Sequence, residues 1–477
     1  MTPNRERNLN RTTMMGMVVG SMVGAGIFSL PATFGAATGP FGALVAWTIA
    51  GTGMLMLAFV FQFLAMRKPD LDAGIFTYAR EGFGNYVGFL AAIGFWTGGC
   101  LGSTTYFVLI KSTLGAAIPA FGQGNTIPAV AVSSLVLWTI HFMILRGVKE
   151  AAVINRLVTL AKVIPILTFI IILTVAFQKD LFAANFWGGE QRDLGHVTAQ
   201  VRRTMLVTVF VFIGVEGASV FSRYARNRSD VGWATVMGFL GVLCLMVLVT
   251  LLPYGVMMRP ELAGLRQPSM AGVLAAVVGT WGAVFISVGL IVSVLGAYLA
   301  WTLLCAEALY SASRYELVPR VFSHENKNGV PSTALWLTNG LVQTFLVLTI
   351  FAEYAFELTL EMTSAMTLIP YLLVAAYGLK LTLSGESYSH DPPRLRQRET
   401  VFAAIGTLYA IFMIMAGGLE YVMLACILLA PATLLFVYAR RERYETTFTV
   451  PEVLLFGAIA LGALAGIYSL ATGTTVL

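Results

Sequence analysis

The stretch GSMVGAGIFSLP, Gly20–Pro31, lies inside the first long apolar segment of the chain. It contains three glycines and ends in a proline, and both residue types weaken helices. In the hydrocarbon core of a membrane, unwound backbone leaves polar groups without water, at a cost of several kcal/mol each, unless those groups line a polar cavity. The stretch therefore predicts a membrane helix that is broken where a polar ligand can bind.

A second interpretation of the same stretch is close helix packing. Gly16, Gly20 and Gly24 are four residues apart, so one face of a helix through them is smooth. Small residues at this spacing allow two membrane helices to approach closely. The stretch by itself leaves both interpretations open.

The composition indicates a membrane protein. Of the 477 residues, 57% are hydrophobic and only 11% are charged, whereas soluble domains carry about 25% charged residues. The apolar runs at 44–65 and 238–258 can each span a hydrocarbon core about 30 Å thick. The net charge of +6 is not arranged as a basic stripe interleaved with aromatic residues, which argues against nucleic acid as a partner.

Thirteen membrane-spanning helices are expected. Their approximate cores are 13–35, 42–66, 85–118, 128–145, 152–177, 203–224, 233–257, 282–311, 332–352, 359–383, 400–417, 420–438 and 452–471. With the N-terminus inside, 22 of the 30 Lys and Arg residues fall in inside loops and six in outside loops. The positive-inside rule therefore predicts that the protein lies in the inner membrane with its N-terminus on the cytoplasmic side. With thirteen spans, the C-terminus is expected outside.

The sequence offers no sign of a metal site, a cofactor or an enzyme. The four cysteines are scattered through apolar runs without CxxC spacing, and the four histidines are equally dispersed. No HExxH motif and no GxSxG motif is present, so a membrane-embedded enzyme is disfavoured. A channel is disfavoured as well, because no span carries a filter motif or a regular charged face.

The sixth span carries a similar interruption. It reads VFVFIGVEGASVFSRYAR, with Gly214, Glu216 and Gly217 at mid-membrane depth. Four spans separate it from the first interruption, as two five-helix repeats of inverted orientation would require. The predicted fold is thus an all-α polytopic membrane protein with two inverted five-helix repeats, broken helices 1 and 6, and extra C-terminal helices. The repeats are expected at 11–177 and 200–384, and three additional spans at 399–472.

Paired interruptions of this kind point to the binding site of a transporter. Exposed N–H groups of the first break would hold an anion such as a carboxylate. Free carbonyl groups of the second break would hold an ammonium group. An α-amino acid carries both charges.

Four stretches resemble a known family. They are GSMVGAGIFSLP, DAGIFTYAREGFG (72–84), FIGVEGASVFSRYARNRSDVGWAT (212–235) and LGAYLAWTLLCAEAL (295–309). They are similar to the basic amino acid/polyamine antiporters of the amino acid–polyamine–organocation superfamily, and within it to the bacterial arginine/ornithine antiporters. The resemblance covers nearly the whole chain. It implies the inverted-repeat transporter fold, amino acid substrates and, as in some relatives, a homodimer in the lipid membrane.

The resemblance also implies which residues bind substrate. The carboxylate would meet the backbone of Gly24, Ala25, Gly26 and Ile27, and the ammonium group the carbonyls near Phe212, Ile213 and Val215. Trp301 aligns with an aromatic that stacks on the substrate's long side chain, although packing on lipid or a neighbouring helix is the alternative. Further positions that match family contacts or a gating aromatic are Phe95, Trp96, Ser103 and Phe210. Some relatives have a serine at 25, and relatives often have a tyrosine or an asparagine at 95 or 103, so these contacts differ here.

Charged residues inside spans are candidates for coupling or gating. A carboxylate at the depth of Glu216 is costly, so it is expected to sense protons, gate the pathway or attract a cationic substrate, unless it only caps the broken helix. Lys162 lies roughly 10–15 Å into the fifth span. In several relatives a lysine here occupies the place of the sodium ion of sodium-driven carriers. The resemblance therefore implies a sodium-independent carrier in which Lys162 braces the first and fifth helices. The alternative is a lysine whose side chain snorkels to the inner membrane surface. Glu307, on the eighth span, is a candidate partner or inner-gate residue.

Two loop segments are candidate gates by the resemblance. They are 67–84 on the inside and 259–281 on the outside, and by composition alone both are ordinary interfacial loops.

The predicted function is exchange of basic amino acids by alternating access, with arginine entering and ornithine leaving. Two rivals remain within transport: a proton-coupled amino acid symporter in which Glu216 carries the proton, and exchange of another amino acid with its amine, such as lysine with cadaverine.

Overall fold

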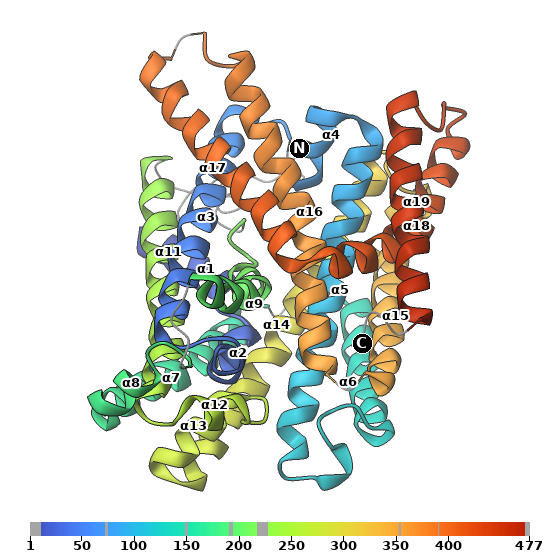
Figure 1. Cartoon of the computed structure of the whole chain (residues 1–477). Coiled ribbons are helices and arrows are strands. Elements are labelled where there is room, and N and C mark those ends of the chain that lie inside the picture. The colour runs from blue at the N-terminus through green and yellow to red at the C-terminus, as the bar shows by residue number, and fades with distance from the viewer. Residues whose placement is uncertain are drawn as a thin grey trace. The chain divides into compact units, whose positions relative to one another are not determined.

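The computed structural model describes residues 11–71, 75–147, 151–189, 194–216, 228–352, 354–389 and 391–472. Within these ranges every regular element is an α-helix or a 3-10 helix, and no strand occurs (Figure 1). The predicted all-α class is confirmed.

Among the described residues, ten helices are long and apolar enough to cross a membrane without interruption. They are α3 (Pro40–Arg67), α5 (Asn85–Gly115), α6 (Ile127–Leu145), α11 (Arg228–Leu251) continued by η4 (Leu252–Gly255), α14 (Thr280–Arg314), α15 (Ser332–Leu348) continued by η6 (Thr349–Phe351), α16 (Ala355–Ser384), α17 (Pro393–Gly417), α18 (Leu419–Glu442) and α19 (Val450–Ala471). The chain is therefore a multi-pass membrane protein.

The other three predicted spans are bent or broken. The fifth is α7 (Ala151–Ala176), which turns by 102° into α8 (Lys179–Asn185) and raises the count to eleven if the bent pair is one span. The first is divided into α1 (Arg11–Met22), η1 (Ala25–Ser29) and α2 (Leu30–Ala37), and the sixth begins as α9 (Leu194–Phe212). Within the described ranges each of the thirteen predicted segments overlaps helix, but only ten of them, or eleven with the bent pair, have the length and hydropathy of a membrane span.

Five shorter elements complete the described structure. They are α4 (Ile75–Phe83), η2 (Pro119–Phe121), α12 (Arg259–Ala263), α13 (Ser269–Val278) and η5 (Arg320–Ser323).

The chain divides into two compact units. The first unit comprises Met1–Gly74, Lys162–Gly289 and Val374–Met413, and the second comprises Ile75–Ala161, Leu290–Leu373 and Ile414–Leu477. Each unit draws segments from both predicted repeats. The inverted relation of the repeats remains a prediction.

An aromatic column forms part of the core of the first unit. Phe34 of α2 stacks on Trp47 of α3 at 5.2 Å, and Trp47 meets Phe212 of α9 edge-on at 5.9 Å. Phe212 in turn stacks on Phe239 of α11 at 5.1 Å. These contacts fix α2, the second half of the broken first span, against three other helices.

In the second unit, a glycine stripe on α5 allows close helix packing. A methyl group added at Gly98 would lie 2.9 Å from Oγ1 of Thr367, and one at Gly94 would lie 3.2 Å from the carbonyl oxygen of Met366. Both neighbours belong to α16, so α5 and α16 approach at small residues, as membrane helices commonly do.

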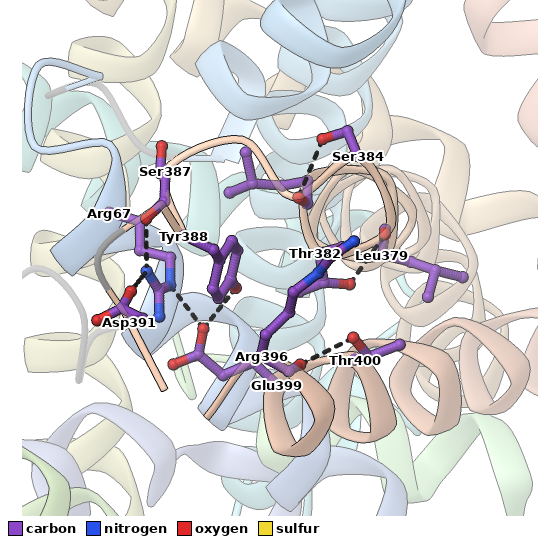
Figure 2. Close-up of polar contacts among 11 residues, drawn as sticks. Arg67, Leu379, Thr382, Ser384, Ser387, Tyr388, Asp391, Arg396, Glu399 and Thr400 are labelled. Atoms are coloured by element: carbon purple, nitrogen blue, oxygen red, sulfur yellow. Dashed lines mark hydrogen bonds and ion pairs between the residues drawn. The ribbon is translucent and has the colours of Figure 1, made fainter. Parts of the chain in front are cut away.

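The end of α3 is joined to the loop between α16 and α17, and to the first turns of α17, by a half-buried set of polar contacts here named the Arg67 cluster (Figure 2). Arg67 donates from Nε to Glu399 at 2.6 Å and from Nη1 to Asp391 at 2.8 Å and to the carbonyl oxygen of Ser387 at 3.0 Å. Its guanidinium lies 3.6 Å from the ring centre of Tyr388, whose hydroxyl donates to Glu399 at 2.5 Å. Burial and this hydrogen bond raise the pKa of the Tyr388 phenol, so the hydroxyl stays protonated as a donor.

Arg396 fixes the other end of the same loop. Its guanidinium donates to the carbonyl oxygen of Thr382 at 2.7 Å (Figure 2). It also donates to the carbonyl oxygen of Leu383 at 2.8 Å, and both acceptors are in the last turn of α16. Gly385 follows with φ +75°, the left-handed conformation that commonly ends a helix. The loop between α16 and α17 is thereby held to the end of α3 by Arg67 and to the end of α16 by Arg396.

Glu399→Gln is expected to destabilise the protein by about 1–3 kcal/mol, because it removes the charge of a nearly buried acceptor shared by two donors. Glu386→Gln is a matched control in the neighbouring ion pair with Lys68, where Glu386 is 61% exposed. Exposed pairs contribute about 0–1 kcal/mol. Thermal unfolding of the purified protein compares the two, and equal melting temperatures for both variants would show that the Arg67 cluster is not stabilising.

Candidate functional site

The first span is interrupted where its glycines lie. α1 ends at Met22, and Gly24 has an extended backbone with φ −110° and ψ −156°. The 3-10 helix η1 follows, and α2 begins at Leu30. Pro31 occupies the first turn of α2, where a missing N–H is tolerated because the first amides of a helix have no acceptor in it. The predicted break of this helix is confirmed.

All five residues of η1 are buried. Within it, the hydroxyl of Ser29 donates to the carbonyl oxygen of Gly26 at 2.7 Å. The amides of Ala25 and Gly26 are at the start of this helix, where amides have no acceptor within the helix itself. This is the arrangement that the predicted carboxylate contact requires.

The sixth span also stops being helical at the predicted depth. α9 ends at Phe212, and residues 213–216 form a turn in which the amide of Val215 donates to the carbonyl oxygen of Phe212 at 3.1 Å. Gly214 has φ +106°, a conformation that L-residues rarely adopt. Gly217 and the rest of 217–227 lie outside the described residues.

The two interruptions meet within the first unit. The hydroxyl of Ser21 donates to the carbonyl oxygen of Gly214 at 3.0 Å. A methyl group added at Gly214 would lie 2.4 Å from the carbonyl oxygen of Ser21, and one at Gly26 would lie 2.7 Å from Cδ1 of Phe210. Glycine is therefore required on both sides of this approach.

Glu216 folds back onto the break that contains it. Its side chain is 8% exposed, and Oε2 accepts the amide of Gly214 at 3.1 Å. This hydrogen bond places the carboxylate directly at the turn. Capping of the broken helix and a role in transport both stay predictions for Glu216.

Lys162 connects α7 with α1. Its side chain is 8% exposed, and Nζ donates to the carbonyl oxygen of Gly20 at 3.3 Å. That carbonyl belongs to the last turn of α1, where carbonyls lack a partner in the helix and a cation is favourable. The contact is the one that bracing of the first and fifth helices requires.

In the second unit, the predicted aromatic residues come together. The rings of Phe95 and Trp301 are 6.0 Å apart with an interplanar angle of 43°. A methyl group at Gly99 would lie 3.4 Å from Cε3 of Trp301 and 2.3 Å from Sγ of Cys305, so this glycine lets α14 approach α5.

The other predicted residues of the second unit have separate surroundings. Trp96 donates from Nε1 to Oγ1 of Thr338 at 3.0 Å, which ties its polar atom to α15. Ser103 is buried at 2% exposure. Glu307 is exposed and accepts the hydroxyl of Ser311 on its own helix at 3.3 Å. Because Glu307 belongs to the second unit and Lys162 to the first, their predicted pairing stays a prediction.

Comparison with known proteins decides the family. The sequence profile of the amino acid permease family matches residues 9–423. The chain belongs to the amino acid permease family. The permease is therefore a transporter and not an enzyme, as expected.

Named relatives of this permease match it over nearly their entire length. An arginine/ornithine antiporter of Pseudomonas aeruginosa is 49% identical over 483 residues, covering all of both chains. A putative arginine/ornithine antiporter of Escherichia coli K12 is 40% identical, covering 96% of this chain and 98% of the relative. An arginine/agmatine antiporter of Chlamydia pneumoniae is 38% identical, covering 98% of each chain. The resemblance on which the predictions rest is confirmed.

One residue of the permease that joins both breaks is missing from the sequence-based predictions. Ser21 supplies the hydrogen bond between the end of α1 and the turn at Gly214. A hydroxyl group in an apolar run, directly beside an interruption, is the signal that could have identified it.

Proposed function

We propose that this permease exchanges basic amino acids across the cytoplasmic membrane by alternating access, with arginine entering and ornithine leaving. The observation that carries the proposal is the match to arginine/ornithine antiporters at 49% and 40% identity over nearly whole chains. The two glycine-lined breaks that meet in the first unit support it, because they supply groups for both charges of an α-amino acid.

The substrate's carboxylate would bind the amides of Gly24, Ala25, Gly26 and Ile27. Its ammonium group would bind carbonyl oxygens of Phe212, Ile213 and Val215. The carbonyl oxygen of Phe212 already accepts one amide, but a carbonyl oxygen has two lone pairs and can accept a second donor.

The family resemblance assigns the side chain of the substrate to a set of aromatic and polar residues. A guanidinium over the indole of Trp301 gains about 0.5–2 kcal/mol. Phe95, beside that indole, would support the same contact. Trp96 and Ser103 are assigned the aromatic and polar side-chain contacts of the family, and Glu307 a place at an inner gate.

Three residues of the first unit are assigned to coupling. Glu216 would attract the cationic substrate, Phe210 would move as a gate against Gly26, and Lys162 would hold α1 to α7 without a sodium ion. The orientation with a cytoplasmic N-terminus and an outside C-terminus, and a possible homodimer, belong to the same proposal.

Exchange follows from the cost of the empty site. Without substrate, backbone groups at the breaks would lose the charged partners that an amino acid supplies, in a dehydrated environment. Reorientation of the empty carrier should therefore be slow, and reorientation with a bound amino acid fast.

Liposomes preloaded with ornithine are expected to take up labelled arginine about fivefold to a hundredfold faster than empty liposomes, since one buried unsatisfied polar group costs about 1–3 kcal/mol. Equal rates would contradict obligatory exchange. Uptake into empty liposomes that follows an imposed pH gradient would instead support proton-coupled symport.

A second candidate is exchange of arginine with agmatine, which the relative from Chlamydia pneumoniae favours. Arginine and ornithine each carry one positive charge, whereas agmatine lacks the carboxylate and carries two. Arginine/ornithine exchange should therefore be insensitive to an imposed membrane potential, and arginine/agmatine exchange should respond to it. Loading the same liposomes with agmatine under a potassium diffusion potential separates the two.

A further inference from the structure

Ser269, the first residue of α13, is fully buried against the broken first span. Its Oγ accepts the amide of Ala32 at 3.1 Å. The same hydroxyl lies 3.0 Å from the carbonyl oxygen of Ser29 and 3.4 Å from that of Phe28, to which it donates. Ala32 is in the first turn of α2, where an amide has no acceptor within the helix. Ser269 therefore caps α2 from a segment more than two hundred residues away in sequence.

The residue that precedes α2 does not perform this capping. Ser29 is at the N-cap position of α2, but its hydroxyl donates backwards to Gly26 and makes no side-chain cap hydrogen bond. The Ser29 hydroxyl thus bonds within η1, whereas the Ser269 hydroxyl accepts an amide at the start of α2. Ser29 thus contacts Ser269 through its carbonyl oxygen and Gly26 through its hydroxyl.

The same outer segment also holds the other end of α2. The guanidinium of Arg259 donates to the carbonyl oxygens of Gly35 at 2.9 Å and Ala36 at 3.1 Å. A methyl group at Gly35 would lie 2.9 Å from Cβ of Leu262, so α12 packs directly on α2. Segment α12–α13 is therefore attached to α2 at both ends, within one compact unit.

We propose that Ser269 is a positioning residue for the substrate's carboxylate. It fixes the junction of η1 and α2. Through Ser29, whose hydroxyl holds the Gly26 carbonyl, it also fixes the peptide plane that carries the amide of Ile27. The inference rests on the proposed function, because it assumes that the Ile27 amide is one of those that bind the carboxylate. It assigns to the segment 259–281 a part in binding, in addition to the gating that the family resemblance implies.

Ser269→Ala is expected to weaken the binding of arginine and of ornithine by a common factor of about three to ten, because both share the carboxylate contact and one neutral hydrogen bond is lost. The maximal exchange rate at saturating substrate should stay close to that of the wild type. Binding of labelled arginine and ornithine to the purified permease, together with KM and kcat of exchange in liposomes, measures both effects.

Ser133→Ala is the matched control. Ser133 is also buried, and its hydroxyl donates to the carbonyl oxygen of Ala129 within α6. It should leave both affinities unchanged. Ser269→Cys keeps a weaker acceptor, so its affinity for arginine and ornithine should lie between those of Ser269→Ala and the wild type. If Ser269→Ala cannot be purified, the same comparison of affinity and KM is made with Ser269→Cys.

Two results would overturn the role of Ser269. One is unchanged affinity for arginine in Ser269→Ala, and the other is a loss of kcat or thermal stability with no rise in KM, which indicates a structural role only. A wild-type permease that binds arginine but does not exchange it for ornithine would overturn the proposed exchange and leave the binding comparison intact.

Discussion

Gly214→Ala is expected to lower arginine/ornithine exchange by at least about a hundredfold, the loss that a displacement of roughly 1 Å in a binding site can cause. Two features of the structure add together. The backbone at Gly214 has φ +106°, and holding another residue in such a conformation costs roughly 1–3 kcal/mol. The new methyl group would also lie 2.4 Å from the carbonyl oxygen of Ser21, so the two breaks must separate.

Exchange by purified Gly214→Ala in ornithine-loaded liposomes measures this effect. Gly241→Ala is the matched control, because a methyl group there meets nothing within 4 Å and Gly241 lies on the exposed side of α11. Alanine is preferred to glycine in a helix by about 1 kcal/mol, so the control should fold at least as well. Normal exchange by Gly214→Ala would mean that the approach of Ser21 to Gly214 is not needed for transport.

Glu216→Gln is expected to reduce arginine exchange by at least about tenfold, because loss of one partner of a desolvated charge pair costs about 2–5 kcal/mol. Glutamine has nearly the same shape, and its carbonyl oxygen can still accept the amide of Gly214. The substitution therefore removes the charge and retains the cap. Competition by neutral amino acids should improve relative to competition by arginine.

Counterflow with a panel of labelled amino acids compares the selectivity of Glu216→Gln with that of the wild type, and so tests whether the charge of Glu216 matters beyond its hydrogen bond to Gly214. Glu420→Gln removes one negative charge from an exposed position at the start of α18 and serves as the control. Equal arginine exchange and unchanged selectivity in Glu216→Gln would leave Glu216 with the capping role alone. Loss of exchange in both variants would point to a general effect of net charge.

Much of the architecture could be predicted because its causes are local in sequence. Apolar runs of about 20 residues can only be helices in a membrane, since every backbone group must find its partner within the segment. The same rule makes Gly24, Gly26 and Pro31 visible as an interruption, and Gly214 beside Glu216 as a second one. The positions at which α1 and α9 end agree with these signals.

The contacts that give the breaks their geometry could not be predicted in this way. Ser21 reaches Gly214 across 193 positions, and Ser269 reaches Ala32 across 237. Arg67 reaches Glu399 across 332. A serine or an arginine in a membrane segment has several possible partners, and its own sequence neighbourhood does not choose among them. Only the packing of distant helices brings one acceptor within about 3 Å, and hydrogen bonds require that distance.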